Sequence, residues 1–513
     1  MNKPVHFFLF LLALAAVMSG LSLLIGGRTL SIGSTDLSYY SPSELFGPLW
    51  GEADSTNIVV LDNEELDALI EATDTLEELA VDTTKGDSPS SVPSNLAVIP
   101  PAKRDTSIQV ADILSFAPFF DALKRLKSDP NAQVRVLHFG DSQLEGDRIT
   151  MQLRDAYQRK YGGTGFGYVA LKPLVAPSAL GFNDGGGFAR KTVFGRRDTS
   201  YKDMRYGHLG SFTVLEKMDS NTYGGRIDLE KRRWGYARAR NFSTARMHLE
   251  GEYTTRVELL VEDTVFSSRV FPEGEWTLAL ELPKVDEFSL VLSSKGPSRI
   301  YGLSFESPTG FHADNVAMRG ASGMMFSKMN DEQFAQSLRR EEYQLIVFQF
   351  GGNAVPYLKD AAHAKRFARA LGRQLGHVQR LYPNAAYMYI GPSDMARKEG
   401  LEMKSYPLIK VLKKHLREEV MRRGAGYWDL YDIMGGEGSM VQWVEAEEPL
   451  AVKDYIHFTP KGAKKVGHQW VAAMGQLELE YNDVMEAIEA EKIRIEDSIN
   501  TFKMSQGTGV QQP

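Results

Sequence analysis

Short apolar runs alternate with amphipathic segments along much of the chain, and this alternation predicts an α/β body. The first run, residues 134–139, is followed by a segment, 147–157, whose apolar positions recur with helical spacing. Three later runs have the same pattern of a buried strand: 345–350, 386–391 and 426–430. Amphipathic helices are predicted at 116–126, 334–338, 361–381, 406–423 and 460–470. Strand-then-helix alternation favours a parallel sheet with helices on both faces.

A different pattern separates the first of these runs from the others. Here short, alternating or β-branched runs are divided by turn residues such as Pro272-Glu273-Gly274. The runs are 245–249, 255–261, 265–270, 276–282, 288–292 and 300–305. We therefore expect an antiparallel β-sandwich over 183–308, inserted into a body made of 108–182 and 309–475. The glycine-rich stretch 161–168 lacks the Lys-Ser/Thr ending of a phosphate loop, and we expect a flexible loop near the site.

The N-terminal segment is almost wholly apolar over residues 7–25, with no charge between Lys3 and Arg28. At about 1.5 Å per residue, this helix would cross most of a bilayer. A cleaved signal peptide is the alternative, because 13–20 contains small residues, but the apolar run continues past it. We expect 1–30 to be an uncleaved transmembrane helix in the inner membrane, with the folded body in the periplasm.

Two further segments differ in composition from the folded body. Residues 31–107 are acidic and end in a Ser- and Pro-rich stretch, which is typical of a flexible stalk. Residues 476–513 contain a predicted charged helix at 478–502, with irregularly spaced apolar positions, and a tail. We expect the first segment to be a mobile stalk and the second a solvated terminal helix. The alternative for each segment is a docking site for a protein partner.

Composition narrows the classes of function. The chain has 513 residues, which is too many for one core of usual size, so two or more domains are expected. Its net charge of -7 gives no support for nucleic-acid binding. It contains no cysteine, which excludes disulfides, thiolate catalysis and cysteine–zinc sites. We expect no cofactor and no metal.

The first candidate catalytic residue is Ser142, in the tripeptide Gly140-Asp141-Ser142 at the end of the first predicted strand. A serine at a strand-to-helix turn exposes its hydroxyl beside unpaired backbone N–H groups and the positive end of a helix dipole, which favour an oxyanion. The tripeptide by itself is equally typical of an ordinary turn that caps a helix. Its interpretation therefore depends on residues elsewhere in the chain.

Asp454 and His457 supply that second observation. A carboxylate three residues before a histidine can hold one imidazole nitrogen while the other faces a hydroxyl. Thr459 and Pro460 have the residue types that open a helix, which places His457 on a loop just ahead of it. Ser142, His457 and Asp454 would therefore provide a nucleophile, a base and an orienting carboxylate, in that order.

Candidate oxyanion donors follow apolar runs, where a parallel sheet places its ligands. These donors are the Ser142 N–H, the Gly320 N–H and the Asn353 side-chain amide.

Four short sequence blocks that contain these candidate residues resemble, in order, the blocks of the SGNH (GDSL-type) hydrolases. They are Gly140-Asp141-Ser142, Gly320, Gly351-Gly352-Asn353 and Asp454-Tyr455-Ile456-His457. The resemblance implies a flavodoxin-like three-layer α/β/α fold for the body. It also implies a Ser142–His457–Asp454 triad and an oxyanion hole of Ser142, Gly320 and Asn353. Gly323 competes with Gly320 for the glycine block. Ala354 departs from the family, which usually has an acidic residue after the asparagine.

A β domain inserted after the first block of an exported chain resembles the peptidoglycan O-acetylesterase subgroup, whose insert is similar to a carbohydrate-binding module. The resemblance implies a serine esterase that removes O-acetyl groups from a cell-envelope polysaccharide, with peptidoglycan as the first candidate. The alternatives are an acetyltransferase that uses the same triad and a non-catalytic glycan-binding envelope protein. Aromatic residues of the insert could stack on sugars or simply pack its strands. They are Tyr206, Trp234, Tyr236, Tyr253 and Trp276.

Overall fold

The computed structural model describes residues 29–32, 35–38, 67–68, 107–195, 198–233 and 235–507. Residues 1–58 form one unit and 59–513 another. In the first unit, β1 (Thr29–Ile32) and β2 (Thr35–Ser38) pair as an antiparallel hairpin. The predicted membrane anchor at 7–25 lies outside the described residues, as does most of the predicted stalk. Within the described ranges, no helix has the length and apolarity needed to span a bilayer.

A six-stranded sheet forms the centre of the body, in the order β16-β4-β17-β18-β21-β3. Its first five strands are parallel, and β3 pairs antiparallel at the edge. Numbered along the chain, the parallel strands have the order 2-1-3-4-5, which is the flavodoxin-like order. The predicted α/β body is confirmed. The strands are β3 (Ile108–Gln109), β4 (Gln133–Gly140), β16 (Gly310–Ala317), β17 (Tyr343–Gln349), β18 (Ala386–Ile390) and β21 (Gly426–Trp428).

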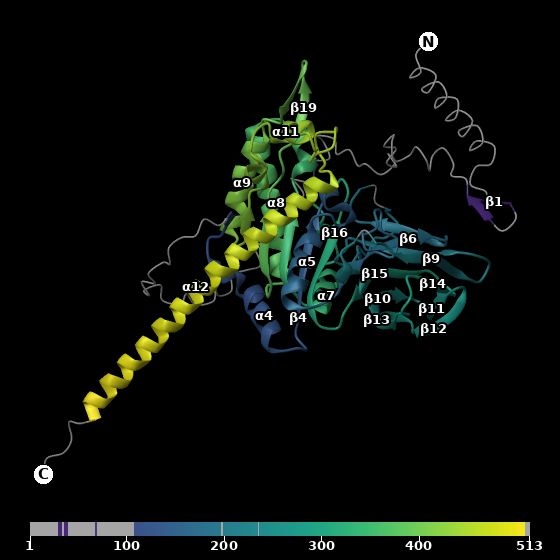
Figure 1. Ribbon diagram of the computed structural model, residues 1–513, viewed down its shortest axis with the longest axis horizontal. Helices are drawn as coiled ribbons and strands as arrows, with labels where there is room; N and C mark the ends of the chain where they lie inside the picture. Colours follow the sequence, from purple (N-terminus) through teal and green to yellow (C-terminus); the bar gives the residue numbers. More distant parts are fainter. Residues whose placement is uncertain are drawn as a thin grey trace. The chain divides into compact units, whose positions relative to one another are not determined.

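Helices cover both faces of this sheet (Figure 1). Because side chains alternate along a strand, Val136 packs in one apolar cluster and its neighbour Leu137 in another. The Val136 cluster contains residues of α4 (Ala117–Ser128), α5 (Thr150–Tyr161) and α12 (Pro460–Gly507). The Leu137 cluster contains residues of α7 (Asp331–Glu341), α8 (Ala361–Leu381) and α9 (Ile409–Arg422). Short helices α10 (Leu430–Met434) and α11 (Ser439–Glu445) precede α12.

Two elements of the body differ from the sequence predictions. The pattern of apolar residues did not indicate β16, because this buried strand carries His312, Asp314 and Asn315. Partners within the fold compensate two of these groups: Asp314 accepts hydrogen bonds from Arg135, and Asn315 accepts the hydroxyl of Thr150 and donates to the carbonyl of Leu144. The ring nitrogens of the buried His312 have no hydrogen-bond partner among the described residues. The other difference is α12, which is one continuous helix where two were predicted, at 460–470 and 478–502. The residues between them are good helix formers, and the single Gly475 does not break the helix.

The insert is antiparallel, as predicted, and contains eleven strands. Eight of them form one connected path instead of two separate sheets, because β8 pairs with β9 as well as with β15, and β9 pairs with β14. The other three lie off this path, where β5 pairs with β15, β6 with β9 and β7 with β8. The end strands β12 and β13 also contact each other, so the sheet is nearly closed. The strands are β5 (Gly165–Val169), β6 (Leu180–Asp184), β7 (Phe188–Thr192), β8 (Ser211–Lys217), β9 (Tyr223–Lys231), β10 (Thr244–Gly251), β11 (Thr255–Val261), β12 (Thr264–Phe271), β13 (Gly274–Glu281), β14 (Glu287–Ser294) and β15 (Ser298–Glu306).

The glycine-rich stretch is part of this sheet, which corrects its prediction as a flexible loop. Its residues 165–168 lie in strand β5, which ends at Val169 and pairs with β15. Gly165 has a φ of +91°, and a Cβ there would lie 2.1 Å from the carbonyl oxygen of Phe305. Glycine is therefore required at this position for close backbone approach, and not for mobility. The antiparallel sheet accordingly begins at Gly165, upstream of the predicted boundary at 183.

A buried charge network joins the insert to the body. The Arg135 guanidinium on β4 donates to Glu306 at the end of β15 at 2.6 Å and to Asp314 on β16 at 3.0 Å. Arg246, on β10, donates to Glu306 at 2.7 Å and to Glu341 of α7 at 2.6 Å. The network thus joins β10 and β15 of the insert to β4, β16 and α7 of the body. Ser142 of the candidate site follows β4 directly.

Candidate active site

A cleft of about 380 Å³, partly open to solvent, lies where β4, β17 and β18 end. After β4, the chain adds β16 on one side of that strand and then β17 on its other side. Ligands of such sheets bind at this switch point, between β4 and β17. Ser142 and Asn353, which follow these two strands, both line the cleft. The other lining residues are Asp141, Gln143, Gln349, Phe350, Gly352, Gly391, Pro392, Ser393, Met395 and Ile456.

Ser142 begins a short 3₁₀ segment, η3 (Ser142–Asp147), directly after β4. The carboxylate of Asp141 caps this segment by accepting the N–H of Gln143 at 3.0 Å. Ser142 itself stands in the first turn, where backbone N–H groups have no partner within the segment. The predicted turn therefore places Ser142 in the lining of the cleft.

Three side chains form a continuous chain of hydrogen bonds at this point. The Oγ of Ser142 lies 2.7 Å from Nε2 of His457. The Nδ1 of His457 lies 2.7 Å from Oδ2 of Asp454. A carboxylate accepts only, so Nδ1 carries the proton when the imidazole is neutral, and Nε2 is left to accept the proton of Ser142. The structure thus brings together the three residues that the sequence proposed as a triad.

The loop before α12 sets the position of the imidazole. The other oxygen of Asp454 accepts the N–H groups of Ile456 at 2.9 Å and His457 at 3.0 Å. Tyr455 makes this turn possible by adopting a left-handed conformation, with a φ of +58°. The helix begins at Pro460, and the hydroxyl of Thr459 accepts the N–H of Gly462 at 3.1 Å, which confirms the predicted cap.

Two residues that the sequence interpretation missed tie this loop to Ser142. The side chain of Gln143 donates to the carbonyl of Ile456 at 2.7 Å and accepts the N–H of Phe458 at 3.3 Å. Arg148 donates to the carbonyls of Phe458 at 2.9 Å and Ser142 at 3.3 Å. Because their bonds go to backbone groups, no pattern of residue types in the sequence indicates these contacts.

Electrostatics favour a charged imidazole beside a charged carboxylate. Burial lowers the pKa of His457, but the hydrogen bond and charge of Asp454 raise it by more, so the pKa lies above its ordinary value. Burial acts to raise the pKa of Asp454, but hydrogen bonds, first that of His457, bring it below its ordinary value. This pair can therefore hold the proton that the imidazole would take from Ser142.

Asn353 lies in the cleft, but its amide is already engaged. The Nδ2 atom donates to Oδ2 of Asp141 at 3.2 Å and to the carbonyl of Ala321 at 3.1 Å. An oxyanion would have to share or replace one of these two bonds. Burial raises the pKa of Asp141 to about 6, so this partner changes charge near neutral pH. Ala354, where the SGNH family usually has an acid, is fully buried.

The two glycines proposed for the remaining donor differ in their surroundings. Gly320 sits in a turn with a φ of +74°, and its N–H is engaged by no hydrogen bond within the part of the chain that the structure describes. Gly323 is packed against apolar side chains, and a Cβ there would meet Leu371 at 2.7 Å. Gly320 therefore fits a donor better than Gly323, although it does not line the cleft itself.

The aromatic residues proposed for sugar stacking divide by exposure. Tyr206 is fully buried in the core. Tyr236 is half-buried and donates to Gln152 at 2.5 Å, so it joins the insert to α5. Tyr253 and Trp276 are exposed on the insert, and Trp234 lies outside the described residues.

Comparison with known proteins adds information on the fold. No protein-family model matches the chain, and no curated protein matches it. A solved structure of a peptidoglycan O-acetylesterase matches with a TM-score of 0.56 and 19% identity, over 72% of this chain and 99% of that one. At this identity the match establishes the fold, and the SGNH-type fold implied by the sequence blocks is confirmed.

Other solved structures match more weakly. A family two carbohydrate esterase from Clostridium thermocellum in complex with cellohexaose has a TM-score of 0.22 and 11% identity, over 59% of this chain and 100% of that one. An acetyl xylan esterase from Butyrivibrio proteoclasticus has a TM-score of 0.23 and 10% identity, over 59% of this chain and 100% of that one. At these TM-scores neither adds to the argument.

Proposed function

We propose that this protein is a serine esterase that removes O-acetyl groups from a cell-envelope polysaccharide, with peptidoglycan as the preferred substrate. One observation carries the proposal: the hydrogen-bonded chain from Ser142 through His457 to Asp454, with 2.7 Å at each step, in a cleft at the switch point of the sheet. A serine needs such a base because its hydroxyl is a poor nucleophile.

In the proposed reaction, His457 takes the proton of Ser142 as Oγ attacks the acetyl carbonyl. The negative charge moves to the carbonyl oxygen, where the N–H groups of Ser142 and Gly320 and the amide of Asn353 are the proposed donors. His457 then gives the proton to the departing sugar oxygen, which leaves an acetyl ester on Ser142. Water attacks this ester with His457 again as base, and acetate leaves as the serine is restored.

Two observations support the choice of substrate. The first is the shared fold with a peptidoglycan O-acetylesterase, which extends over 99% of that chain. The second is the antiparallel insert, which the sequence resemblance likens to a carbohydrate-binding module. An anchor at residues 7–25, with the body in the periplasm, remains part of the proposal.

The direct test offers the full-length protein O-acetylated peptidoglycan, O-acetylated xylan and an aryl acetate, and measures acetate release. We expect release from all three, with the highest kcat/KM on peptidoglycan. Release from xylan alone would keep the esterase and overturn the choice of polymer. No release from any acetyl ester would contradict the proposed function.

A further inference from the structure

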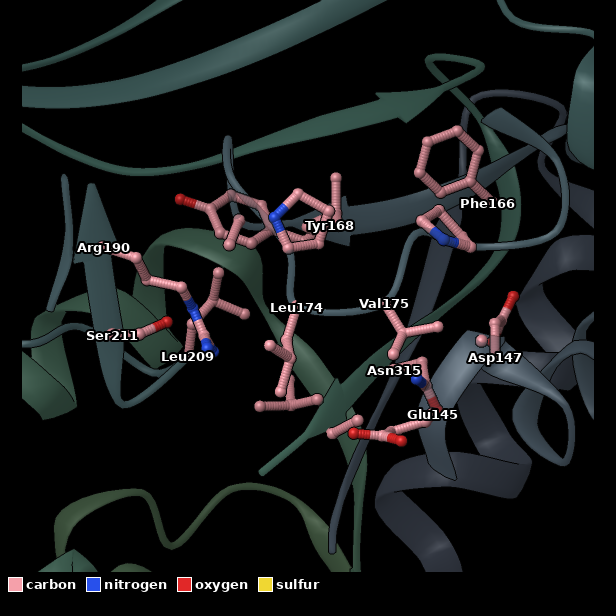
Figure 2. A pocket seen from close by; sticks show the side chains of 17 residues that line it. Glu145, Asp147, Phe166, Tyr168, Leu174, Val175, Arg190, Leu209, Ser211 and Asn315 are labelled. Atoms are coloured by element: carbon pink, nitrogen blue, oxygen red, sulfur yellow. The ribbon is translucent and has the colours of Figure 1, made fainter. Parts of the chain in front are cut away.

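A second, larger cavity lies where the insert meets the body (Figure 2). It measures about 640 Å³, including space open to solvent. Its walls come from β5 and the loop after it, from β7, β8 and β16, and from residues 145–147. The proposed acetyl transfer at Ser142 uses none of these side chains.

Both carboxylates in this cavity already have arginine partners. Glu145 accepts two hydrogen bonds from the guanidinium of Arg319, at 2.5 and 2.8 Å. Asp147 is paired in the same two-bond manner with the buried Arg154. The negative charges of the cavity are therefore balanced before any ligand enters.

Arg190 adds a positive charge that no ion pair among the described residues neutralises, although the charge of Glu145 attracts it without direct contact. Its side chain extends from β7 into the cavity (Figure 2), and its Nε atom is buried without a hydrogen-bond partner. Among the described residues no carboxylate forms an ion pair with Arg190; its guanidinium lies 5.9 Å from the ring of Phe194. Burial lowers the pKa of Arg190 to about 10, which leaves it charged at neutral pH. A buried donor without an acceptor is costly, and an anionic ligand would remove that cost.

The remaining walls fit a sugar ring. Ser211, on the neighbouring strand β8, is opposite Thr192 and so one diagonal step from Arg190 on the same face of the sheet. Its hydroxyl forms no hydrogen bond within the described residues. Leu174 and Val175, 39% and 40% exposed, form an apolar rim. Apolar walls with a few convergent polar groups are typical of ligand sites.

The cavity is also next to the candidate active site along the chain. Its residues Glu145 and Asp147 belong to η3, the same six-residue segment that begins with Ser142. Ser142 and Glu145 are three residues apart, which a chain spans by at most about 10 Å. A glycan with one unit in the cavity could therefore present a neighbouring unit to Ser142.

We propose that this cavity is a subsite for a carboxylate-bearing sugar unit, whose carboxylate pairs with Arg190 and whose ring lies against the rim of Leu174 and Val175. The subsite rests on the proposed function, since it selects the glycan from which acetyl groups are removed. It assigns the substrate to the acidic polysaccharides and gives the insert a direct part in recognition.

The test compares the wild-type protein with Arg190→Gln on two forms of one probe: O-acetylated peptidoglycan glycan chains with free carboxylates, and the same chains with carboxylates converted to amides. Loss of a charge-assisted pair predicts that Arg190→Gln raises KM on the free-carboxylate chains by about tenfold or more. On the amidated chains the two proteins should have the same KM. Arg190→Lys, which keeps the charge, should recover part of the difference.

Arg256→Gln is the matched control, because Arg256 is an exposed arginine of the insert. It should keep the wild-type preference for free carboxylates. Equal KM values for wild type and Arg190→Gln on the free-carboxylate chains would overturn the subsite while acetate release still supported the esterase.

A binding measurement separates the two proposals if no acetate is released. Calorimetry with Ser142→Ala and the free-carboxylate chains should show binding that Arg190→Gln, added to Ser142→Ala, weakens by about tenfold or more. Binding that does not change would overturn the subsite, whatever the catalytic result.

Discussion

Asp454 acts on Ser142 only through the imidazole of His457. This single residue has two effects on the imidazole: it fixes the ring's position and it changes the ring's pKa. It holds Nδ1 at 2.7 Å and raises the pKa of His457 against the opposing effect of burial. A base works only in its neutral form, so the rate should rise with pH through the pKa of His457.

Asp454→Asn tests this role. We expect kcat on an aryl acetate to fall by at least about a hundredfold, because the imidazole loses the partner that fixes its tautomer. Without the carboxylate the pKa of His457 should fall, so the acidic limb of the pH–rate profile should move to lower pH. The profile of kcat/KM between pH 4 and 9 measures this; an unchanged midpoint, or one moved to higher pH, would contradict the assigned role.

Residue types alone predicted a site in which Ser142, His457 and Asp454 meet. The separation of 315 positions between Ser142 and His457 did not prevent this, because each block has a recognisable local pattern. The pattern could not show that Gln143 and Arg148 hold the loop, since their bonds go to backbone N–H and carbonyl groups. It also could not show that the Asn353 amide is engaged by Asp141 and Ala321.

At the scale of the element, apolar periodicity predicted the strands whose side chains are apolar on the buried faces. It missed β16, where buried Asp314 depends on Arg135, because partners far apart in sequence make a polar strand stable. The glycine-rich pattern also gave the wrong prediction for β5. In a sequence, glycines that allow close approach of two backbones cannot be distinguished from glycines that allow mobility.

Gly167→Ala tests this view of β5. The glycine has a φ of +87°, and a Cβ would lie 2.1 Å from Oδ1 of Asp314, which itself accepts the N–H of Tyr168 at 2.8 Å. We expect a loss of about 3–5 kcal/mol in the free energy of unfolding, measured by chemical denaturation, because the buried pair of Asp314 and Arg135 must move.

Gly424→Ala is the control for backbone strain alone. Gly424 has a φ of +70°, and a Cβ there would meet nothing within 4 Å. Its substitution should cost about 1–2 kcal/mol. Equal effects at the two positions would mean that the close approach of β5 adds nothing.

At the scale of the whole molecule, the sequence indicated an insert and a body but not what joins them. The junction is the buried network of Arg135, Arg246, Glu306, Asp314 and Glu341. Isolated charges in a sequence normally indicate surface, so no local pattern identified these as partners. The second cavity also lies between the insert and the body, although none of these five residues lines it. In our proposal, this cavity links the insert to substrate choice.

Arg135→Met should therefore destabilise the unit formed by 59–513. Arg135 is 1% exposed, and its removal leaves Glu306 and Asp314 buried with less compensation. The expected loss is about 3–5 kcal/mol in unfolding free energy. Arg422→Met, at a surface pair with Glu419, should cost about 1 kcal/mol or less. A loss at Arg135 as small as that at Arg422 would contradict the structural role of the network.

The central claim is that Ser142 carries the acetyl group during hydrolysis, and the most direct test is the rate of acetate release from O-acetylated peptidoglycan by full-length wild type and Ser142→Ala. Removing the nucleophile should lower kcat by at least about a thousandfold. Circular dichroism should show the same folded state, because Ser142 is a small side chain that lines the cleft. A Ser142→Ala rate within a few-fold of the wild-type rate would contradict the account.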